Sequence, residues 1–361
     1  MKIGILTHPL RLNCGGIMQN YALSTVLRRM GHEVLTIDRH LDKNGLYVMA
    51  SWFSRLFRRY IMRKNVSTKF NMMHTRKSYL KSALYEDFIN ANIPRTSYVS
   101  CDEKLNVVND WGFDAIVVGS DQVWLRMYIP GTFLSFLKND DVLKVAYAAS
   151  FGKDKLDYTE DELKECSALA KKFNAISVRE KSAVTICKEK LGVESVHVLD
   201  PTLLLTKEDY NQLCNKIPVT QEPILFVYIL DITPWKQELI SKIAEEKQLK
   251  VVDFMRSEDK SIEKWLSLFR DSSFVLTDSF HGTAFSIIYN KQFLTIDNSA
   301  RGNTRFTSLF DDLDLNSRLI HDNSNIDKCA YGEEIQYDVV NETLKKRINE
   351  SKEFLNQSLT K

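Results

Sequence analysis

The chain has 361 residues, enough for about two domains that each bury a core of their own. With 44% hydrophobic and 27% charged residues, its composition is typical of a folded globular protein rather than a disordered one. The 49 basic and 47 acidic residues nearly cancel to a net charge of +2, so the sequence does not predict a general nucleic-acid-binding surface.

Cysteine usage and the N-terminal sequence indicate the cellular compartment. The six cysteines lie far apart, with no C-x-x-C pair and no histidine at zinc-ligand spacing, so we expect reduced thiols and no metal site. The chain opens on a strand pattern without the features of a signal peptide, and no apolar run approaches the roughly 18 residues that span a bilayer. These features predict a cytoplasmic protein.

Strands and helices alternate through the first part of the chain. Residues 2–7 form a short apolar run, a loop follows at 13–16, and a helical pattern then ends at Gly31. Because the next strand is predicted at 33–38, this β-loop-α-β unit requires a parallel sheet. Further elements are predicted in the order strand 115–118, strand 142–148, strand 175–178 and helix 182–191. Together they predict one doubly wound α/β domain over residues 1–217.

A second α/β domain is predicted over residues 218–330. It begins with 223–230, whose continuous apolar character indicates a strand buried on both faces. The elements that follow are predicted as helix 233–248, strand 251–254, helix 262–270, strand 274–277 and strand 292–296. The tail, 331–361, contains a helical pattern from about 338 to 359 that we expect to pack back on the first domain. Two lobes of this kind imply a cleft between them.

Residues 43–85 carry the strongest charge asymmetry of the chain. They contain no acidic residue, and their many Arg and Lys residues are mixed with aromatic and aliphatic ones between Trp52 and Lys81. A basic helix with aromatic residues suits an anionic membrane surface. A solvated helix face whose aromatic residues fill the core would have the same composition. Both interpretations remain open on sequence alone.

The loops that follow parallel strands face the ligand crevice of such sheets, so their polar residues are candidates for a site. Residues 277–282 join a buried strand to a helix N-terminus, which offers backbone N–H groups to an anion, with Ser279 and Gly282 at this turn. His281 can bind phosphate or transfer a proton there, although a lone histidine is more often structural. Arg179 follows another strand and can bind phosphate or carboxylate, or simply pair with Glu180.

Two further loops are candidates for binding a sugar. In 118–124, Trp124 can offer a flat face to a sugar ring and Asp121 can accept a proton from a hydroxyl, although Asp is also a common helix N-cap. In the loop at 13–16, Gly15 and Gly16 can let a ligand approach the backbone, with Asn20 nearby. No G-x-G-x-x-G or Walker motif occurs, which removes the usual support for a nicotinamide or ATP site.

Six short motifs follow one another along the chain. They are Gly15-Gly16 before Gln19-Asn20-Tyr21-Ala22-Leu23, Val118-Gly119-Ser120-Asp121-Gln122-Val123-Trp124, Tyr147-Ala148-Ala149-Ser150-Phe151-Gly152, Ser177-Val178-Arg179-Glu180, Asp200-Pro201-Thr202 and Asp278-Ser279-Phe280-His281-Gly282. Taken together, they resemble the polysaccharide pyruvyl transferase family. They occur in that family's order from about residue 10 to residue 310, and the ordered set is specific although each piece alone is weak.

The resemblance implies a GT-B-like fold, in which two Rossmann-like domains face a central cleft, with the acceptor on the first and the donor on the second. It implies phosphoenolpyruvate as donor, a glycan acceptor and no metal or cofactor. The family's donor-binding arginine maps onto Arg179 and its histidine onto His281. Many relatives carry an arginine two positions before that histidine, where this chain has Ser279, so we expect a second cation from Arg305 or Arg301.

The chemistry of that donor gives a mechanistic hypothesis. Protonation of its methylene makes the central carbon electrophilic, one sugar hydroxyl adds there, and a second displaces phosphate to leave a cyclic ketal. His281 is the candidate proton donor and Asp121 the candidate proton acceptor. Two other functions remain open, because a fold does not fix a function. One is a GT-B glycosyltransferase that uses a nucleotide sugar, and the other is a non-enzymatic protein that binds acidic glycans at a membrane surface through residues 43–85.

Overall fold

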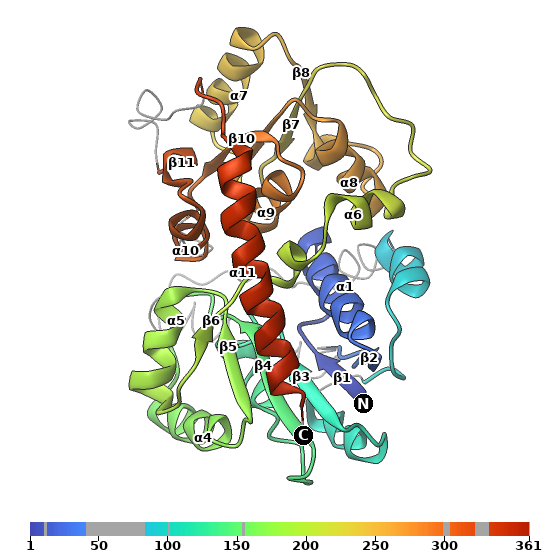
Figure 1. The fold of residues 1–361 in the computed structure, drawn as a ribbon, viewed down its shortest axis with the longest axis vertical. Coiled ribbons are helices and arrows are strands. Elements are labelled where there is room, and N and C mark those ends of the chain that lie inside the picture. Colours follow the sequence, from blue (N-terminus) through green and yellow to red (C-terminus); the bar gives the residue numbers. More distant parts are fainter. Residues whose placement is uncertain are drawn as a thin grey trace, which may run out of the picture.

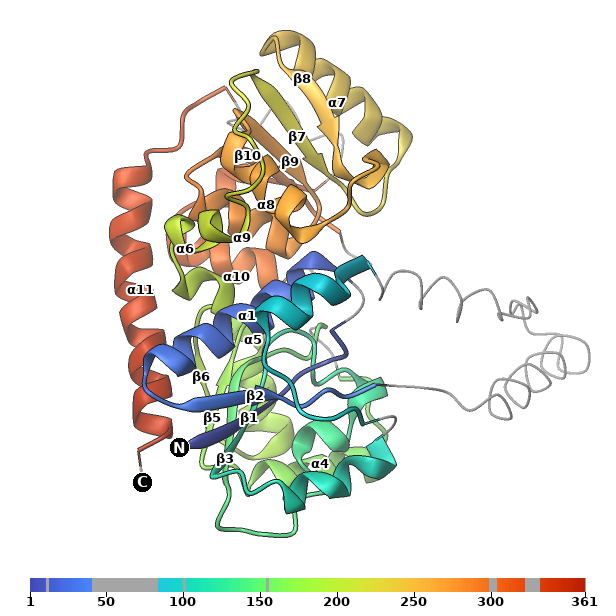
Figure 2. The same ribbon diagram turned by 90° about the vertical axis from the view of Figure 1, so that its right-hand side faces the viewer.

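The computed structural model describes residues 1–10, 13–40, 84–99, 102–153, 156–298, 304–321 and 332–360. Of the basic segment 43–85, all but the last two residues lie outside this range, and so does Arg301. The described chain forms two α/β domains, one above the other in the view of Figure 1. A long C-terminal helix runs along both of them (Figures 1 and 2).

The first domain is built on a six-stranded sheet in which every pair of neighbours is parallel. Its strands, in spatial order, are β2 (Glu33–Thr36), β1 (Lys2–Leu6), β3 (Ala115–Val118), β4 (Leu143–Ala149), β5 (Ala175–Val178) and β6 (Val196–His197). Its helices include α1 (Cys14–Arg29), α4 (Glu160–Ala170) and α5 (Lys181–Ile186), and residues 84–92 are also helical. All four residues of β3 are buried, as expected of a central strand covered on both faces.

The second domain is built on a five-stranded parallel sheet. Its strands, in spatial order, are β11 (Leu319–Ile320), β10 (Gln292–Ile296), β9 (Phe274–Thr277), β7 (Ile224–Tyr228) and β8 (Lys250–Asp253). The helices of this part of the chain, in sequence order, are α6 (Lys207–Leu213), which precedes β7, and then α7 (Pro234–Glu246), α8 (Ile262–Asp271), α9 (Phe280–Ile288) and α10 (Thr304–Leu313). Two parallel sheets with alternating helices confirm the predicted class of two Rossmann-like domains facing each other.

The C-terminal helix α11 (Tyr337–Ser358) contacts both domains (Figure 2). Near its start, the Tyr337 hydroxyl donates a hydrogen bond to the carbonyl of Lys291, beside β10. Near its end, the Ser351 hydroxyl accepts one from the backbone N–H of Leu199 at 3.0 Å. The helix therefore connects the side of the second domain to the side of the first.

Most strands lie where the sequence predicts them, including 115–118, 175–178, 274–277 and 292–296. Strands β6 and β11 were not predicted, because two residues each are too short to give a pattern. The predicted loop at 13–16 is wrong: it forms the first turn of α1, where the Asn13 side chain accepts a hydrogen bond from the N–H of Gly16. Among the described residues, no helix combines the length and apolar character needed to cross a membrane.

Candidate active site between the two domains

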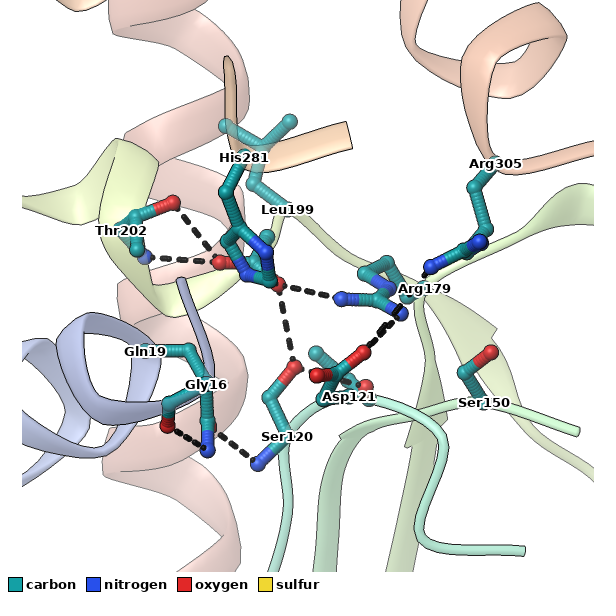
Figure 3. A network of polar contacts seen from close by, with 12 residues as sticks. Gly16, Gln19, Ser120, Asp121, Ser150, Arg179, Leu199, Thr202, His281 and Arg305 are labelled. Carbon is teal, nitrogen blue, oxygen red and sulfur yellow. Dashed lines mark hydrogen bonds and ion pairs between the residues drawn. The ribbon is translucent and has the colours of Figure 1, made fainter. Parts of the chain in front are cut away.

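Charged and titratable side chains from both domains meet in one buried cluster, which is shown in part in Figure 3. Each follows the carboxyl end of a strand or begins a helix, so the parallel topology of the two sheets places them together. Every one of these residues is at most 8% exposed. The first domain contributes His8, Asp121, Arg179 and Asp200, and the second contributes His281 and Arg305.

Asp121 is the central acceptor of this cluster. Its Oδ1 accepts a hydrogen bond from Nη2 of Arg179 at 2.8 Å, and its Oδ2 lies 2.9 Å from Nε2 of His8. Burial would raise the pKa of Asp121, but the charge of Arg179 and the contact with His8 outweigh it and hold the pKa well below its usual value. An ionised carboxylate held in this way is a poor general base.

Arg179 is fixed by carboxylates on two sides. Its Nη1 donates to Oδ2 of Asp200 at 2.8 Å, while its Nη2 donates to Asp121. Asp200 is itself held by the backbone N–H and the hydroxyl of Thr202, at 3.0 and 2.8 Å. The Arg179 guanidinium also lies over the ring of Phe280 from the second domain, 4.7 Å from the centroid. Arg179 therefore connects the two domains as well as the loops of the first.

His281 lies at the start of α9 and packs directly on α1 of the other domain. A Cβ at Gly15 would fall 2.2 Å from Nδ1 of His281, so only glycine permits this approach. The Nε2 of His281 makes no hydrogen bond with the described residues and lies 3.8 Å from Oδ2 of Asp200. Burial lowers the pKa of His281, and the nearby carboxylates do not fully offset this effect. The surroundings of His281 therefore favour the neutral imidazole over the charged one.

Arg305 approaches the same cluster from α10. Its Nη1 lies 4.0 Å from Oδ1 of Asp121, and its guanidinium lies 5.9 Å from the centroid of the Phe280 ring. Burial and the charge of Arg179 lower the pKa of Arg305 to about 10. Two guanidinium groups from opposite domains thus face one aromatic ring, and the Asp121 carboxylate lies within 4.0 Å of both.

The space between the domains at this cluster is small. Arg179, Asp200, Phe280 and Arg305 contribute to the lining of a cavity of about 10 Å³, which is near the size of one water molecule. A ligand larger than water does not fit this cavity unless the domains separate or the side chains move. In the part of the chain that the structure describes, no group of three or more His, Cys, Asp or Glu side chains is placed to hold a metal ion.

Comparison with known proteins identifies the family. The model of the polysaccharide pyruvyl transferase family matches residues 13–300, most of the chain and every strand from β2 to β10. The chain belongs to this family. No curated protein sequence matches it.

The pyruvyltransferase chain also has structural neighbours of low sequence identity. One is the UDP-GlcNAc 2-epimerase from Methanocaldococcus jannaschii, with a TM-score of 0.49, 12% identity and coverage of 97% of this chain and 93% of that one. Another is a putative UDP-N-acetylglucosamine 2-epimerase from Listeria monocytogenes, with a TM-score of 0.49, 9% identity and coverage of 99% and 90%.

Several residues predicted to form the pyruvyltransferase site come together in the structure. Asp121, Arg179, His281 and Arg305 lie in the cluster, and Gly15 and Gly16 pack against two of its histidines. Ser279 is the N-cap of α9, where its hydroxyl accepts from the N–H of Gly282 at 3.4 Å. Ser279 and Gly282 thus define the helix start that presents His281. Asp121, by contrast, caps no helix.

Two predicted acceptor contacts are wrong. Trp124 is 0% exposed, because its ring stacks on Phe133 at a centroid distance of 4.9 Å within the core, so it has no face to offer a sugar. Asn20 is also fully buried, and its Oδ1 accepts from the hydroxyl of Thr36 on β2 at 2.9 Å. Both side chains stabilise the first domain rather than line the cluster.

Two residues of the cluster were not predicted to have a role. His8 follows β1 and Asp200 follows β6, at the same edge of the sheet as Asp121 and Arg179. The rule that polar residues after parallel strands face the ligand crevice applies to His8 directly. The signal was therefore present in Thr7-His8-Pro9, next to a strand that the sequence predicts clearly.

Proposed function

We propose that this pyruvyltransferase moves pyruvate from phosphoenolpyruvate onto two hydroxyls of a sugar in a bacterial surface glycan or its lipid-linked precursor. A cyclic ketal forms, phosphate is released, and no metal or cofactor takes part. The observation that carries the proposal is the pairing of Arg179 and Arg305 from opposite domains over the ring of Phe280, beside His8 and His281, in a member of this family.

The donor's charge fits this arrangement. Phosphoenolpyruvate carries a carboxylate and a phosphate, and planar guanidinium groups bind both kinds of oxygen. The charge of Arg179 is one of the two causes that lower the pKa of Arg305, so an anion placed between them would relieve that repulsion. We therefore assign donor binding chiefly to Arg305, with Arg179 held nearby and the N-terminus of α9 completing the anion site.

The proposed reaction needs charge stabilisation more than a strong nucleophile. After the methylene of the donor is protonated, the central carbon is electron-poor and the sugar hydroxyl adds to it. Guanidinium groups that hold the phosphate also stabilise its departure when the second hydroxyl attacks. A closed, buried site strengthens these interactions and limits the competing attack of water on the donor.

The acceptor is proposed to lie on the cytosolic side, where lipid-linked precursors face the cytoplasm. The membrane-surface interpretation of residues 43–85 stays a prediction, because all but two of these residues lie outside the described part of the chain. If it holds, the protein should bind vesicles rich in anionic lipid and detach at high salt, since such attraction is screened. Binding insensitive to both salt and anionic lipid would contradict it.

Calorimetric titration with phosphoenolpyruvate tests the proposal. An Arg305→Gln variant is expected to lose at least about tenfold in affinity, the equivalent of about 1.4 kcal/mol. The matched control is Arg126→Gln, because Arg126 pairs with Glu162 on the surface and is expected to leave binding unchanged. Binding of nucleotide sugars alone would favour a glycosyltransferase. Binding of neither ligand would favour the non-enzymatic glycan-binding function.

A further inference from the structure

His8 is a buried titratable group to which the family resemblance assigns no role. Its two ring nitrogens both face oxygen acceptors: Nε2 lies 2.9 Å from Oδ2 of Asp121, and Nδ1 lies 3.3 Å from the carbonyl oxygen of Pro9. A neutral imidazole has one N–H and cannot donate to both acceptors, whereas the imidazolium donates to both. The contacts of His8 therefore favour its charged form.

The electrostatic surroundings of His8 agree with its contacts. Burial lowers the pKa of His8, but the hydrogen bond and the charge of Asp121 outweigh burial and leave the pKa raised. Two features act against the charge. Arg179 repels it, and the N-terminus of α1 is close, since a Cβ at Gly16 would fall 2.6 Å from Cε1 of His8. The contacts and the raised pKa of His8 therefore both favour the protonated form that a general acid needs before it acts.

His281 has the opposite character. Its pKa is lowered by burial, and its Nε2 makes no hydrogen bond with the described residues. In the tautomer that carries its hydrogen on Nδ1, the neutral imidazole can accept a proton at Nε2 and has none to give from that atom. The cluster therefore contains one histidine suited to give a proton and one suited to take it.

Asp121 places His8 next to the groups proposed to hold the donor. One oxygen of its carboxylate contacts His8, and the other contacts Arg179 at 2.8 Å and lies 4.0 Å from Arg305. His8 is thus separated from both guanidinium groups by a single carboxylate. Gly15 and Gly16, adjacent at the start of α1, pack against His281 and His8 respectively, so both histidines contact the same helix start.

We propose that His8 is the acid that protonates the methylene carbon of the donor, and that His281 is the base that takes the proton of the first sugar hydroxyl. Asp121 stays ionised and positions His8. This inference rests on the proposed function and reverses the roles expected from sequence, in which His281 gives the proton and Asp121 receives one.

The steps balance as follows. Nε2 of His8 stays on Asp121, and Nδ1–H, which has the longer of the two hydrogen bonds at 3.3 Å, passes its proton to the methylene carbon. The electron pair of the carbon–carbon double bond forms the new C–H bond. The first hydroxyl oxygen bonds to the central carbon as its proton moves to Nε2 of His281. The second hydroxyl then bonds to the same carbon, phosphate leaves with the bonding pair, and that hydroxyl's proton leaves with the phosphate. The proton on His281 is available to restore His8.

Three matched glutamine substitutions test the roles. His8→Gln keeps an N–H that can donate to Asp121 but cannot release a proton, and His281→Gln removes the proposed base. His32→Gln makes the same change at a histidine outside the cluster. The protonation of His8 is read from the ring ¹⁵N signals of histidine-labelled protein at pH 7, assigned by their loss in His8→Gln. Proton delivery is read as exchange of the methylene hydrogens of phosphoenolpyruvate in D₂O.

The expected result is a His8 signal of the doubly protonated ring, together with methylene exchange by the wild-type protein, His32→Gln and His281→Gln. In His8→Gln, exchange should fall by about 10²–10⁴-fold while calorimetry still detects phosphoenolpyruvate binding. A neutral His8 at pH 7, exchange that survives in His8→Gln, or binding by the wild-type protein without exchange would overturn the assignment and leave donor binding intact. Absence of phosphoenolpyruvate binding by the wild-type protein would instead remove the proposed function itself.

Discussion

Asp121→Asn is the substitution that most directly perturbs the interdomain cluster. The carboxylate has two charged or titratable partners, Arg179 at 2.8 Å and His8 at 2.9 Å, and Arg305 lies 4.0 Å away. The amide that replaces it carries no charge, so the buried Arg179 guanidinium keeps only Asp200 as a charged hydrogen-bond partner. Removing one member of a buried ion pair typically costs about 3–5 kcal/mol of folding free energy.

Urea unfolding followed by circular dichroism measures this effect. The matched control is Asp157→Asn, which removes the carboxylate of a pair with Lys153 at 2.9 Å whose side chains are 50% and 57% exposed. An exposed pair contributes only about 0–1 kcal/mol, so the control should be nearly neutral. Because the pKa of Asp121 is lowered in the folded state, its contribution is present above about pH 4 and is lost as the pH falls through the folded value. A loss at pH 7 no larger than in Asp157→Asn would refute the reasoning.

Further predictions concern packing, pH and domain closure. Gly15→Ala would place a methyl group 2.2 Å from Nδ1 of His281 and should lower the free energy of unfolding by about 1–3 kcal/mol in the same urea assay. The control is Gly332→Ala, whose methyl group would meet open space, and it should change the free energy of unfolding by less than about 0.5 kcal/mol. Because the pKa of His8 is raised in the folded state, its protonation adds a stability that is fully present below pH 6.5 and is lost as the pH rises through the pKa of the folded state. The free energy of unfolding of His8→Gln should therefore fall less steeply over that pH range than that of the wild-type protein, and an equally steep fall would contradict this. The Asp312 carboxylate on α10 accepts a hydrogen bond from the Lys181 ammonium group of the first domain at 2.8 Å. Asp312→Asn should therefore favour separation of the domains and increase the radius of gyration that small-angle scattering measures without ligand. An unchanged radius of gyration would count against this.

The fold could be predicted from sequence because its strands are unusually clear. Buried parallel strands such as 224–228 and 274–277 are continuous apolar runs, and short polar loops separate them from helices. Elements without such a pattern were missed, as with β6 and β11. The start of α1 was predicted as a loop because glycines disfavour helices. Glycine is required at both positions because His281 and His8 pack against them, and this tertiary contact cannot be seen in the local sequence.

The candidate site could be predicted only in part. The strand-end rule and the family motifs found Arg179 and His281, and the missing cation led to Arg305. Trp124 was assigned wrongly because local sequence does not tell which face of a turn an aromatic ring takes, and the Phe133 ring that receives it comes from a separate segment. The contact between His8 and Asp121 joins residues 113 positions apart, so no local pattern could show that they pair.

The activity that we propose for this chain is the transfer of pyruvate from phosphoenolpyruvate to a glycan. The most direct test is to incubate the purified protein with phosphoenolpyruvate labelled with ¹³C at its central carbon and with lipid-linked glycan precursors extracted from the cells that make it. We predict that the label appears in the glycan as a carbon bonded to two oxygens, with phosphate released in equal amount, and that Arg305→Gln greatly slows both. Label that stays in phosphoenolpyruvate, or that appears only as free pyruvate, would contradict the claim.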